Sequence, residues 1–262
     1  MGMTNSLYEK NRRFFADRHA RTRHSATTIA GVVSDVLGTP PARVIDVGCG
    51  VGTFLDAFKS SGATTVHGLE GTWLDPRHLV IERDELTQHD LEEPLPEVGS
   101  FDLAVCLEVA EHLTPARADS FVDELCRLAP AVLFSAAIPL QGGVGHYNEQ
   151  WPSWWAERFA TRGYQASDCI RGRIWSDDAI GTWYRQNTIL YLAAEHPALA
   201  GLSIVSDPAS IDLVHPAMYL DKTPGNSIPK AAKALRRATK RTIVSGASNL
   251  MRRGFGKGPE KH

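Results

Sequence analysis

Residues 43–58 read RVIDVGCGVGTFLDAF, which predicts a strand, a glycine-rich turn and a helix in direct succession. Glycines at 48, 50 and 52 let the backbone turn sharply and let a ligand approach it closely. The G-x-G-x-G spacing, preceded by Asp46, differs from the G-x-G-x-x-G of dinucleotide sites, and no G-K-[ST] of a P-loop follows. The segment therefore predicts a ligand-binding turn at one edge of an α/β sheet, with a plain strand-to-helix turn as the alternative.

The sequence around this turn continues the alternation of strands and helices. Short β-branched runs and helical segments from Arg43 to about Pro139 predict a parallel sheet with helices on both faces. The expected strands lie at 43–48, 64–70, 86–90, 101–108 and 131–139, with two more near 164–172 and 183–194. Helices are expected at 53–62 and 115–129 and in the Trp-rich stretch 151–163, whereas residues 71–85 predict a loop.

The chain is expected to divide into a core with two flanking parts. Residues 1–38 predict an N-terminal helical segment, and 39–195 predict the core, with acceptor-site elements at about 140–185. Residues 196–221 predict a loop extension, and 222–262 form a basic tail.

Charge is unevenly distributed along the chain. Residues 222–262 hold eleven Lys/Arg and one acid, whereas residues 1–221 hold seventeen bases and twenty-nine acids. An acidic body is a poor platform for nucleic acid, so a nucleic-acid partner is not expected. For the tail, three interpretations are open: contact with an anionic membrane surface, pairing with a neighbouring subunit, or disorder. Four scattered cysteines without a C-x-x-C pair, and the lack of a long apolar run, favour a cytoplasmic protein whose tail attracts it weakly to the inner membrane face.

Acids follow the next strands at the same edge of the predicted sheet. Glu70 ends the second strand and Asp90 follows the third. Carboxyl ends of parallel strands are where ligands bind in open α/β sheets. A carboxylate at position 70 can accept both hydroxyls of a ribose, and one at position 90 can accept the exocyclic amine of an adenine. The edge is therefore expected to bind an adenosine-containing molecule.

With these motifs, residues 40–195 resemble the class I S-adenosylmethionine-dependent methyltransferases. The resemblance implies a Rossmann-like, seven-stranded, mostly parallel sheet whose last strand runs antiparallel. It also implies that Asp46 and the glycine turn hold the methionine part of S-adenosylmethionine, that Glu70 binds the ribose, and that Asp90 and the backbone of Leu91 bind the adenine. The turn has no cluster of basic residues, which fits a sulfonium cofactor that carries no phosphate.

The fourth strand leads into LEVAEHL, residues 107–113. Helical spacing would place Glu108, Glu111 and His112 on one face, where carboxylates and an imidazole suit a divalent cation. We expect Mg²⁺ first, with Mn²⁺, Fe²⁺ or Zn²⁺ as alternatives. Two other interpretations are open: ordinary residues that border a pocket, or His112 as a general base without a metal.

This E-x-x-E-H pattern resembles small-RNA 3′-terminal 2′-O-methyltransferases and ubiquinone-pathway O-methyltransferases. In the RNA family a further histidine beyond the fifth strand completes the metal site, which implies His146 in GGVGHYNEQW as the fourth ligand. The catalytic set is therefore expected to be Glu111, His112 and His146.

The second half bears on the acceptor. Trp151, Trp154 and Trp155 fit either a buried helix face or a platform on which a sugar ring stacks. A buried helix face is the first expectation for them. A looser resemblance to methyltransferases of bacterial polysaccharide and sugar gene clusters favours a sugar acceptor. We expect an O-methyltransferase that acts on a small sugar or glycan hydroxyl. The alternatives are a metal-free methyltransferase of a phenolic metabolite and a non-catalytic cofactor-binding regulatory module.

Overall fold

The computed structural model describes residues 17–223. Contacts divide the chain into two units, and the first, Met1–His215, contains the whole sheet. The second begins at Pro216, and its described part is helix α9, Pro216–Lys222. The expectations for the start of the N-terminal segment and for the basic tail beyond residue 223 lie outside the described residues.

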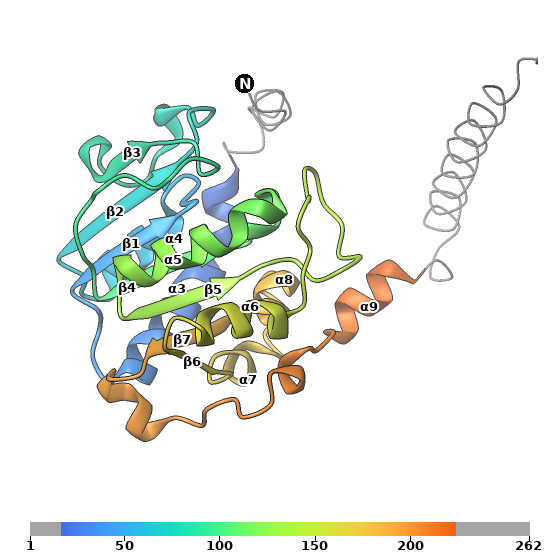
Figure 1. Cartoon of the computed structure of the whole chain (residues 1–262). Coiled ribbons are helices and arrows are strands. Elements are labelled where there is room, and N and C mark those ends of the chain that lie inside the picture. The colour runs from blue at the N-terminus through green and yellow to red at the C-terminus, as the bar shows by residue number, and fades with distance from the viewer. Residues whose placement is uncertain (1–16, 224–262) are drawn as a thin grey trace, which may run out of the picture. The chain divides into compact units, whose positions relative to one another are not determined.

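A seven-stranded sheet in the order β3-β2-β1-β4-β5-β7-β6 forms the centre of the first unit (Figure 1). All neighbouring strands run parallel except β7, which is antiparallel to both β5 and β6. This confirms the predicted fold class and the antiparallel last strand. The strands are β1 (Arg43–Val47), β2 (Thr65–Glu70), β3 (Leu86–Gln88), β4 (Leu103–Leu107), β5 (Ala131–Ser135), β6 (Tyr164–Ser167) and β7 (Ile189–Ala193).

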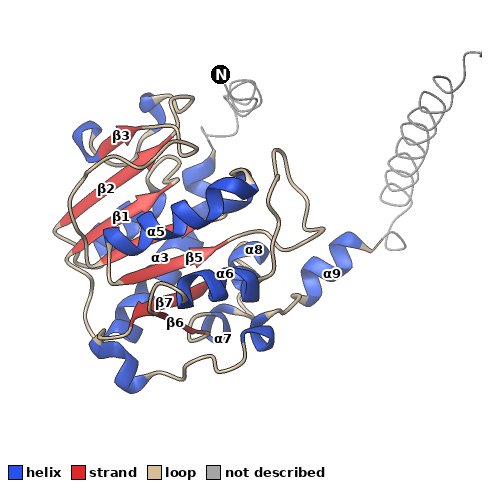
Figure 2. Ribbon diagram, viewed as in Figure 1, coloured by secondary structure: helices blue, strands red, loops and turns tan. Residues whose placement is uncertain are grey.

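Helices cover both faces of this sheet (Figure 2). On β4, Leu103 and Val105 pack with one set of helices, and Ala104 and Cys106 pack with the other, because successive strand residues face opposite ways. The first face is covered by α3 (Arg18–Leu37), α4 (Thr53–Ser60), α7 (Arg171–Ile174) and α8 (Thr182–Asn187), and the second by α5 (Ala118–Leu128) and α6 (Pro152–Ala160).

Two elements differ from the sequence-based predictions in the core. The stretch 183–194 was expected to be strand throughout, but its first part is helix α8 and the strand begins only at Ile189. The side chain of Arg185 is buried there and donates hydrogen bonds to the carbonyl of Trp175 and to Asp178, so tertiary contacts override the strand preference of the aromatic residues. The strand expected at 164–172 ends at Ser167, and α7 follows it.

The connecting segments contain short helical elements. Residues 71–85 contain no α-helix but two single 3₁₀ turns, Pro76–His78 and Arg83–Glu85. In 196–221, two 3₁₀ turns, Pro197–Gly201 and Pro208–Ile211, interrupt the expected loop. The helix α9 was not predicted.

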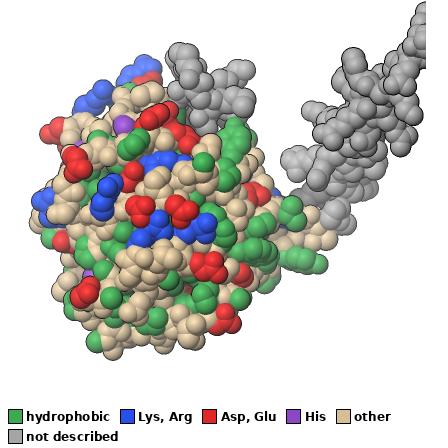
Figure 3. Space-filling model, viewed as in Figure 1, with side chains coloured by type: hydrophobic (Ala, Val, Ile, Leu, Met, Phe, Trp, Pro, Cys, Tyr) green, Lys and Arg blue, Asp and Glu red, His purple; other side chains and the backbone are tan. Residues whose placement is uncertain are grey.

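Basic and acidic side chains are interspersed on the face that Figure 3 shows. Arg158 and Arg162 lie within ion-pair distance of Asp119, and Arg162 also pairs with Asp123. None of the described helices combines the length and the apolarity that crossing a membrane requires.

Candidate active site

A cavity of about 650 Å³ opens at the carboxyl ends of the central strands. It lies where the strand order reverses between β1 and β4, which is the place where open α/β sheets bind ligands. It brings together most of the residues that the sequence analysis identified: Gly48, Gly50, Glu70, Asp90, Leu91, Glu108, Glu111, His112 and His146 all line it.

The glycine turn and Glu70 are joined directly. The backbone N–H of Gly50 donates to Oε2 of Glu70 at 2.7 Å, and that of Gly71 donates to Oε1 at 2.8 Å. Glu70 is 6% exposed, and burial raises its pKa while these two donors oppose the rise. Each carboxylate oxygen retains a second acceptor site, so the group can still accept ribose hydroxyls.

Asp46 lies at the end of β1 beside a smaller hollow of about 30 Å³ that Arg18 and Thr22 of α3 also line. Burial raises the pKa of Asp46 well above its ordinary value, the neighbouring Glu70 adds to the rise, and Arg18 opposes it. A buried carboxylate in this position suits a cationic group, such as the ammonium group of a bound methionine moiety. The positively charged guanidinium of Arg18 lines the same hollow and suits the carboxylate of that methionine moiety.

Gly52 lies outside both hollows, although it belongs to the same turn. It forms the N-cap of α4, and a Cβ atom there would lie 2.8 Å from the side chain of Ile81. Its contribution is close packing of the turn. The prediction that Gly52 contacts the cofactor stays a prediction.

Asp90 and Leu91, the residues expected to bind the adenine, line the cavity side by side in the chain. Asp90 is exposed and accepts a hydrogen bond from the backbone N–H of Glu92, whereas Leu91 is buried. The carbonyl of Leu91 accepts Nε of Arg117, a buried guanidinium that also pairs with Glu124. Arg117 thereby fixes the backbone of this loop.

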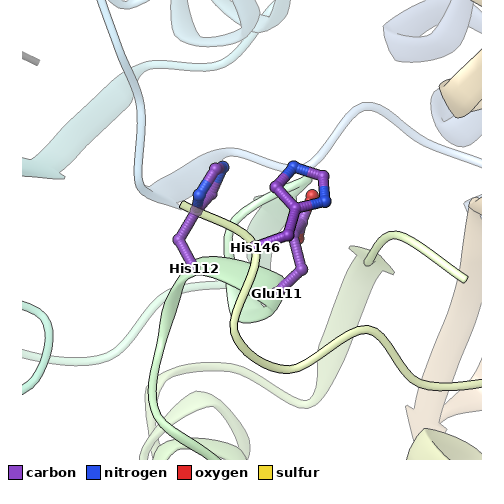
Figure 4. A group of neighbouring side chains, drawn as sticks. All are labelled: Glu111, His112 and His146. Atoms are coloured by element: carbon purple, nitrogen blue, oxygen red, sulfur yellow. The ribbon is translucent and has the colours of Figure 1, made fainter. Parts of the chain in front are cut away.

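Three possible metal ligands meet at the other end of the cavity (Figure 4). One side-chain atom each from Glu111, His112 and His146 lies within 4.8 Å of the others. Glu111 and His112 come from the 3₁₀ turn Ala110–His112, and His146 comes from the loop after β5. The two imidazole rings meet edge to face with their centroids 4.8 Å apart. The predicted partnership of His146 with the E-x-x-E-H segment is thus present as a spatial arrangement.

Glu108 does not share a helical face with Glu111 and His112, so that expectation was wrong. It directly follows β4 with a left-handed backbone, φ 58°, and the 3₁₀ turn starts only at Ala110. Glu108 is not in the group formed by Glu111, His112 and His146. The prediction that it is a fourth ligand stays a prediction.

Both histidines have one ring nitrogen held by an acceptor. Nδ1 of His112 lies 3.2 Å from the carbonyl oxygen of Gly145, and Nδ1 of His146 lies 2.9 Å from a carboxylate oxygen of Glu149. A proton on each Nδ1 leaves the lone pair on Nε2, as in most metal-binding histidines. Burial, together with the neighbouring His146, lowers the pKa of His112 to about 4, so its ring is neutral at neutral pH.

The glycine-rich loop gives His146 its position. A Cβ atom on Gly143 would lie 2.1 Å from Nε2 of His146, so only glycine leaves room for the ring. Gly145 has φ 75°, a conformation that favours glycine, and its carbonyl is the acceptor for His112. The stretch QGGVGH therefore places His146 and supplies the hydrogen-bond acceptor of His112.

Glu111 is 1% exposed, and its Oε2 has no hydrogen-bond partner among the described residues. Burial raises the pKa of this carboxyl well above its ordinary value, and the nearby Glu108 raises it further. An unpartnered carboxylate oxygen in a buried place is costly unless a cation or a donor meets it.

Several residues at the site were not identified from the sequence as site residues. Arg18, Thr22 and Trp73 line the cofactor end, and Gln141 lines the other end. Arg18 sits in a polar helix with no motif. Gln141 adjoins the conspicuous glycines, which was a signal that could have been used.

The tryptophans of the second half were expected either to pack in the core or to form a platform for a sugar ring, and individual residues differ. Trp155 is 1% exposed and packs against Phe134, which confirms a core role for this residue. Trp154 is covered by the guanidinium of Arg158, 3.0 Å above its ring. Trp183, 44% exposed, is the tryptophan of the second half that lines the cavity.

Comparison with known proteins agrees with this architecture. A model of the methyltransferase domain family matches residues 11–185, and no curated protein matches the chain. A putative O-methyltransferase from Nostoc punctiforme shares 12% identity and the fold, covering 68% of this chain and 58% of that one with a TM-score of 0.50.

Two other solved structures are similar at lower scores. Magnesium protoporphyrin IX methyltransferase from Synechocystis with bound S-adenosylmethionine is 19% identical, with coverage of 72% of this chain and 91% of that one and a TM-score of 0.48. The small RNA methyltransferase HEN1 is 14% identical over 68% of this chain and 26% of that one, with a TM-score of 0.46.

The family match spans the glycine turn, Glu70, Asp90, the Glu111–His112 turn and His146, all of which belong to the site described above. The chain therefore belongs to the methyltransferase domain family and is an S-adenosylmethionine-dependent methyltransferase.

Proposed function

We propose that this methyltransferase transfers the methyl group to a hydroxyl of a sugar or glycan, with the help of a divalent cation. The observation that carries the proposal is the meeting of Glu111, His112 and His146 within 4.8 Å, in the same cavity as the cofactor-binding turn. A transferable methyl group and a set of metal-binding side chains then share one enclosed space.

The residues present fit a cation. Oε2 of Glu111 has no partner in the described part of the chain, and each histidine has its Nδ1 held by an oxygen acceptor, as metal-binding histidines commonly do. Two imidazoles and one carboxylate favour Mn²⁺, Fe²⁺ or Zn²⁺, whereas Mg²⁺, the first expectation from the sequence, prefers oxygen ligands and water. We therefore place these transition metals ahead of Mg²⁺.

The chain's own residues contribute mainly by positioning. Asp46, Glu70 and the glycine turn would hold the cofactor, and Glu111, His112 and His146 would hold the cation, which would lower the pKa of the acceptor hydroxyl. Methyl transfer would break the sulfonium S–CH₃ bond and form an O–CH₃ bond, with the hydroxyl proton passing to solvent. In-line positioning of oxygen and methyl group supplies much of the acceleration.

A metal-free reaction with His112 as general base has less support. An efficient general base has a pKa near the working pH, and burial lowers the pKa of His112 to about 4. Its Nδ1 is also held by the carbonyl of Gly145. The lowered pKa suits a neutral metal ligand better than a base.

Two features of the second half suit an uncharged acceptor. Arg171, Arg173 and Arg185 are each within ion-pair distance of an acid: Arg171 of Asp168, Arg173 of Asp35 and Arg185 of Asp178. The half-exposed Trp183 offers a face on which the apolar C–H side of a sugar ring can stack. These features support a neutral sugar.

The test uses the full chain with S-adenosylmethionine, Mn²⁺ and a panel of methyl glycosides and simple phenols, with S-adenosylhomocysteine as the measured product. We expect turnover with a glycoside, its loss in EDTA, its return with Mn²⁺, and its loss in Glu111→Ala. Glu157→Ala, at an exposed acid outside the cavity, serves as the control. Turnover that persists in EDTA and in Glu111→Ala would refute the role of the cation, and turnover of phenols alone would refute the sugar.

A further inference from the structure

Glu108 has an unusual backbone for a non-glycine residue. Its φ is 58°, and its N–H donates to both the carbonyl and the hydroxyl of Ser135, at 3.0 and 3.1 Å. Strained conformations of this kind persist where the surrounding structure enforces them, and they cluster at functional sites. The conformation sends the chain away from β4 at the cavity wall, which Glu108 lines.

Two neutral amides hold the carboxylate of Glu108, one on each oxygen. Nδ2 of Asn187 donates to Oε1 at 3.0 Å, and Nε2 of Gln141 donates to Oε2 at 3.0 Å. A carboxylate has about four acceptor sites. Ser135 also makes a side-chain hydrogen bond with this carboxylate, so one acceptor site remains for a donor from the cavity.

The two amides cannot turn, because a third one locks them. Nε2 of Gln186 donates to Oδ1 of Asn187 at 2.9 Å and to Oε1 of Gln141 at 3.2 Å, and its own oxygen accepts the N–H of His215 at 2.9 Å. The exposed fractions of Gln141, Gln186 and Asn187 are 7%, 0% and 2%. This buried network directs amide nitrogens, and not amide oxygens, at Glu108.

Glu108 lies beside the metal-binding group without belonging to it. It lines the same cavity as Glu111 and His146, yet the group of mutually close ligand atoms comprises Glu111, His112 and His146. The network thus orients the Glu108 carboxylate as a second hydrogen-bond acceptor in the cavity where the reacting hydroxyl would bind. A neutral O–H donor satisfies a carboxylate that already accepts two neutral N–H donors.

We propose that Glu108 binds a second hydroxyl of the acceptor, adjacent to the one that is methylated, and so makes the enzyme selective for vicinal diols. Gln141 and Asn187 act as positioning residues for this carboxylate. The inference rests on the proposed function, since it requires the reacting hydroxyl to lie at the metal site formed by Glu111, His112 and His146. Glu108 then binds the acceptor, whereas Glu111 binds the cation.

The first experiment measures the affinity of the full chain for Mn²⁺ by electron paramagnetic resonance. We expect Glu108→Gln to bind Mn²⁺ within about threefold of the unsubstituted protein, and Glu111→Gln to bind it at least about tenfold more weakly, the size of effect seen when groups at a metal site are lost. Thermal melting checks that each variant folds, and Glu157→Gln is the matched control.

The second measurement compares cis-1,2-cyclohexanediol with cyclohexanol in the presence of Mn²⁺ and S-adenosylhomocysteine, so that no reaction occurs. Bound Mn²⁺ speeds the relaxation of nearby probe protons. In the unsubstituted protein, we expect the relaxation rate of the diol protons to be enhanced at least about fivefold more than that of the alcohol protons. This corresponds to a difference of about 1 kcal/mol in binding free energy, which is the contribution of one added hydrogen bond. Glu108→Gln should abolish this preference.

The outcomes separate the two proposals. If the unsubstituted protein does not bind Mn²⁺, the proposed function fails, and this inference fails with it. If it binds Mn²⁺ but Glu108→Gln weakens the affinity as much as Glu111→Gln, Glu108 is a metal ligand and the inference alone is overturned. Equal enhancement of diol and alcohol in the unsubstituted protein also overturns it, and that comparison needs no substitution.

Discussion

The buried carboxyl group of Glu111 should cost the metal-free protein stability. It is 1% exposed, one of its oxygens has no partner among the described residues, and Glu108 lies close enough to repel it. Burial raises its pKa well above the ordinary value of 4.5. A carboxyl group with a raised pKa in the folded state stabilises the fold at low pH and loses that contribution as the pH rises through the folded pKa.

Glu111→Gln removes this charge with little change of shape. An unsatisfied buried polar group costs about 1–3 kcal/mol, and the neutral amide recovers part of it, so we expect a gain of about 1–2 kcal/mol where Glu111 is ionised. In a chain of this length that is a rise in melting temperature of about 2–8 °C. The gain should grow from low pH to high pH.

The assay is thermal melting of both proteins in EDTA at several pH values between about 5 and 9, because the ionised fraction of a carboxyl group rises with pH. Adding Mn²⁺ should raise the melting temperature of the unsubstituted protein and leave that of Glu111→Gln nearly unchanged. If Glu111→Gln melts lower than the unsubstituted protein in EDTA at every pH, the buried carboxylate does not destabilise the metal-free fold, and the expected gain is refuted.

Further substitutions test the rest of the site. Glu70→Ala removes the acceptor of the Gly50 N–H and should weaken S-adenosylhomocysteine binding at least about tenfold by calorimetry, as the loss of charge-assisted hydrogen bonds predicts. Gly143→Ala places a Cβ 2.1 Å from the loop histidine, so Mn²⁺ affinity should fall while cofactor affinity stays, and Gly31→Ala, in open space, should change neither. Because burial raises the pKa of Asp46, cofactor binding should weaken as the pH falls through that value, and Asp46→Asn should remove this pH dependence along with most of the affinity. Arg117→Met breaks a buried ion pair and should lower stability by about 3–5 kcal/mol in urea unfolding.

Local patterns predicted the sheet because each strand carries its own signal. The glycine turn, Glu70 and Asp90 follow their strands directly, so knowing that parallel strands end at one edge was enough to bring them together. The histidine pair was reached through a resemblance, and the structure places His146 beside His112.

What the sequence did not reveal depends on contacts between distant segments. The helical spacing of Glu108 relative to Glu111 was misleading, because the left-handed turn at Glu108 is set by Ser135 on the neighbouring strand. Residues 183–187 have the aromatic character of a strand, yet buried polar contacts of Arg185 and Asn187 make them helical. No short window of sequence contains those partners.

The antiparallel strand β7 makes the active site depend on the end of the core. The family match stops at residue 185, but β7, Ile189–Ala193, is paired with both β5 and β6 and follows directly after Asn187 and Thr188. A chain cut at the end of the family match would leave two unpaired strand edges, which invite aggregation. It would also lose the amide that holds Oε1 of Glu108. The smallest functional fragment of this enzyme must therefore extend past residue 193, well beyond the segment by which its family is identified.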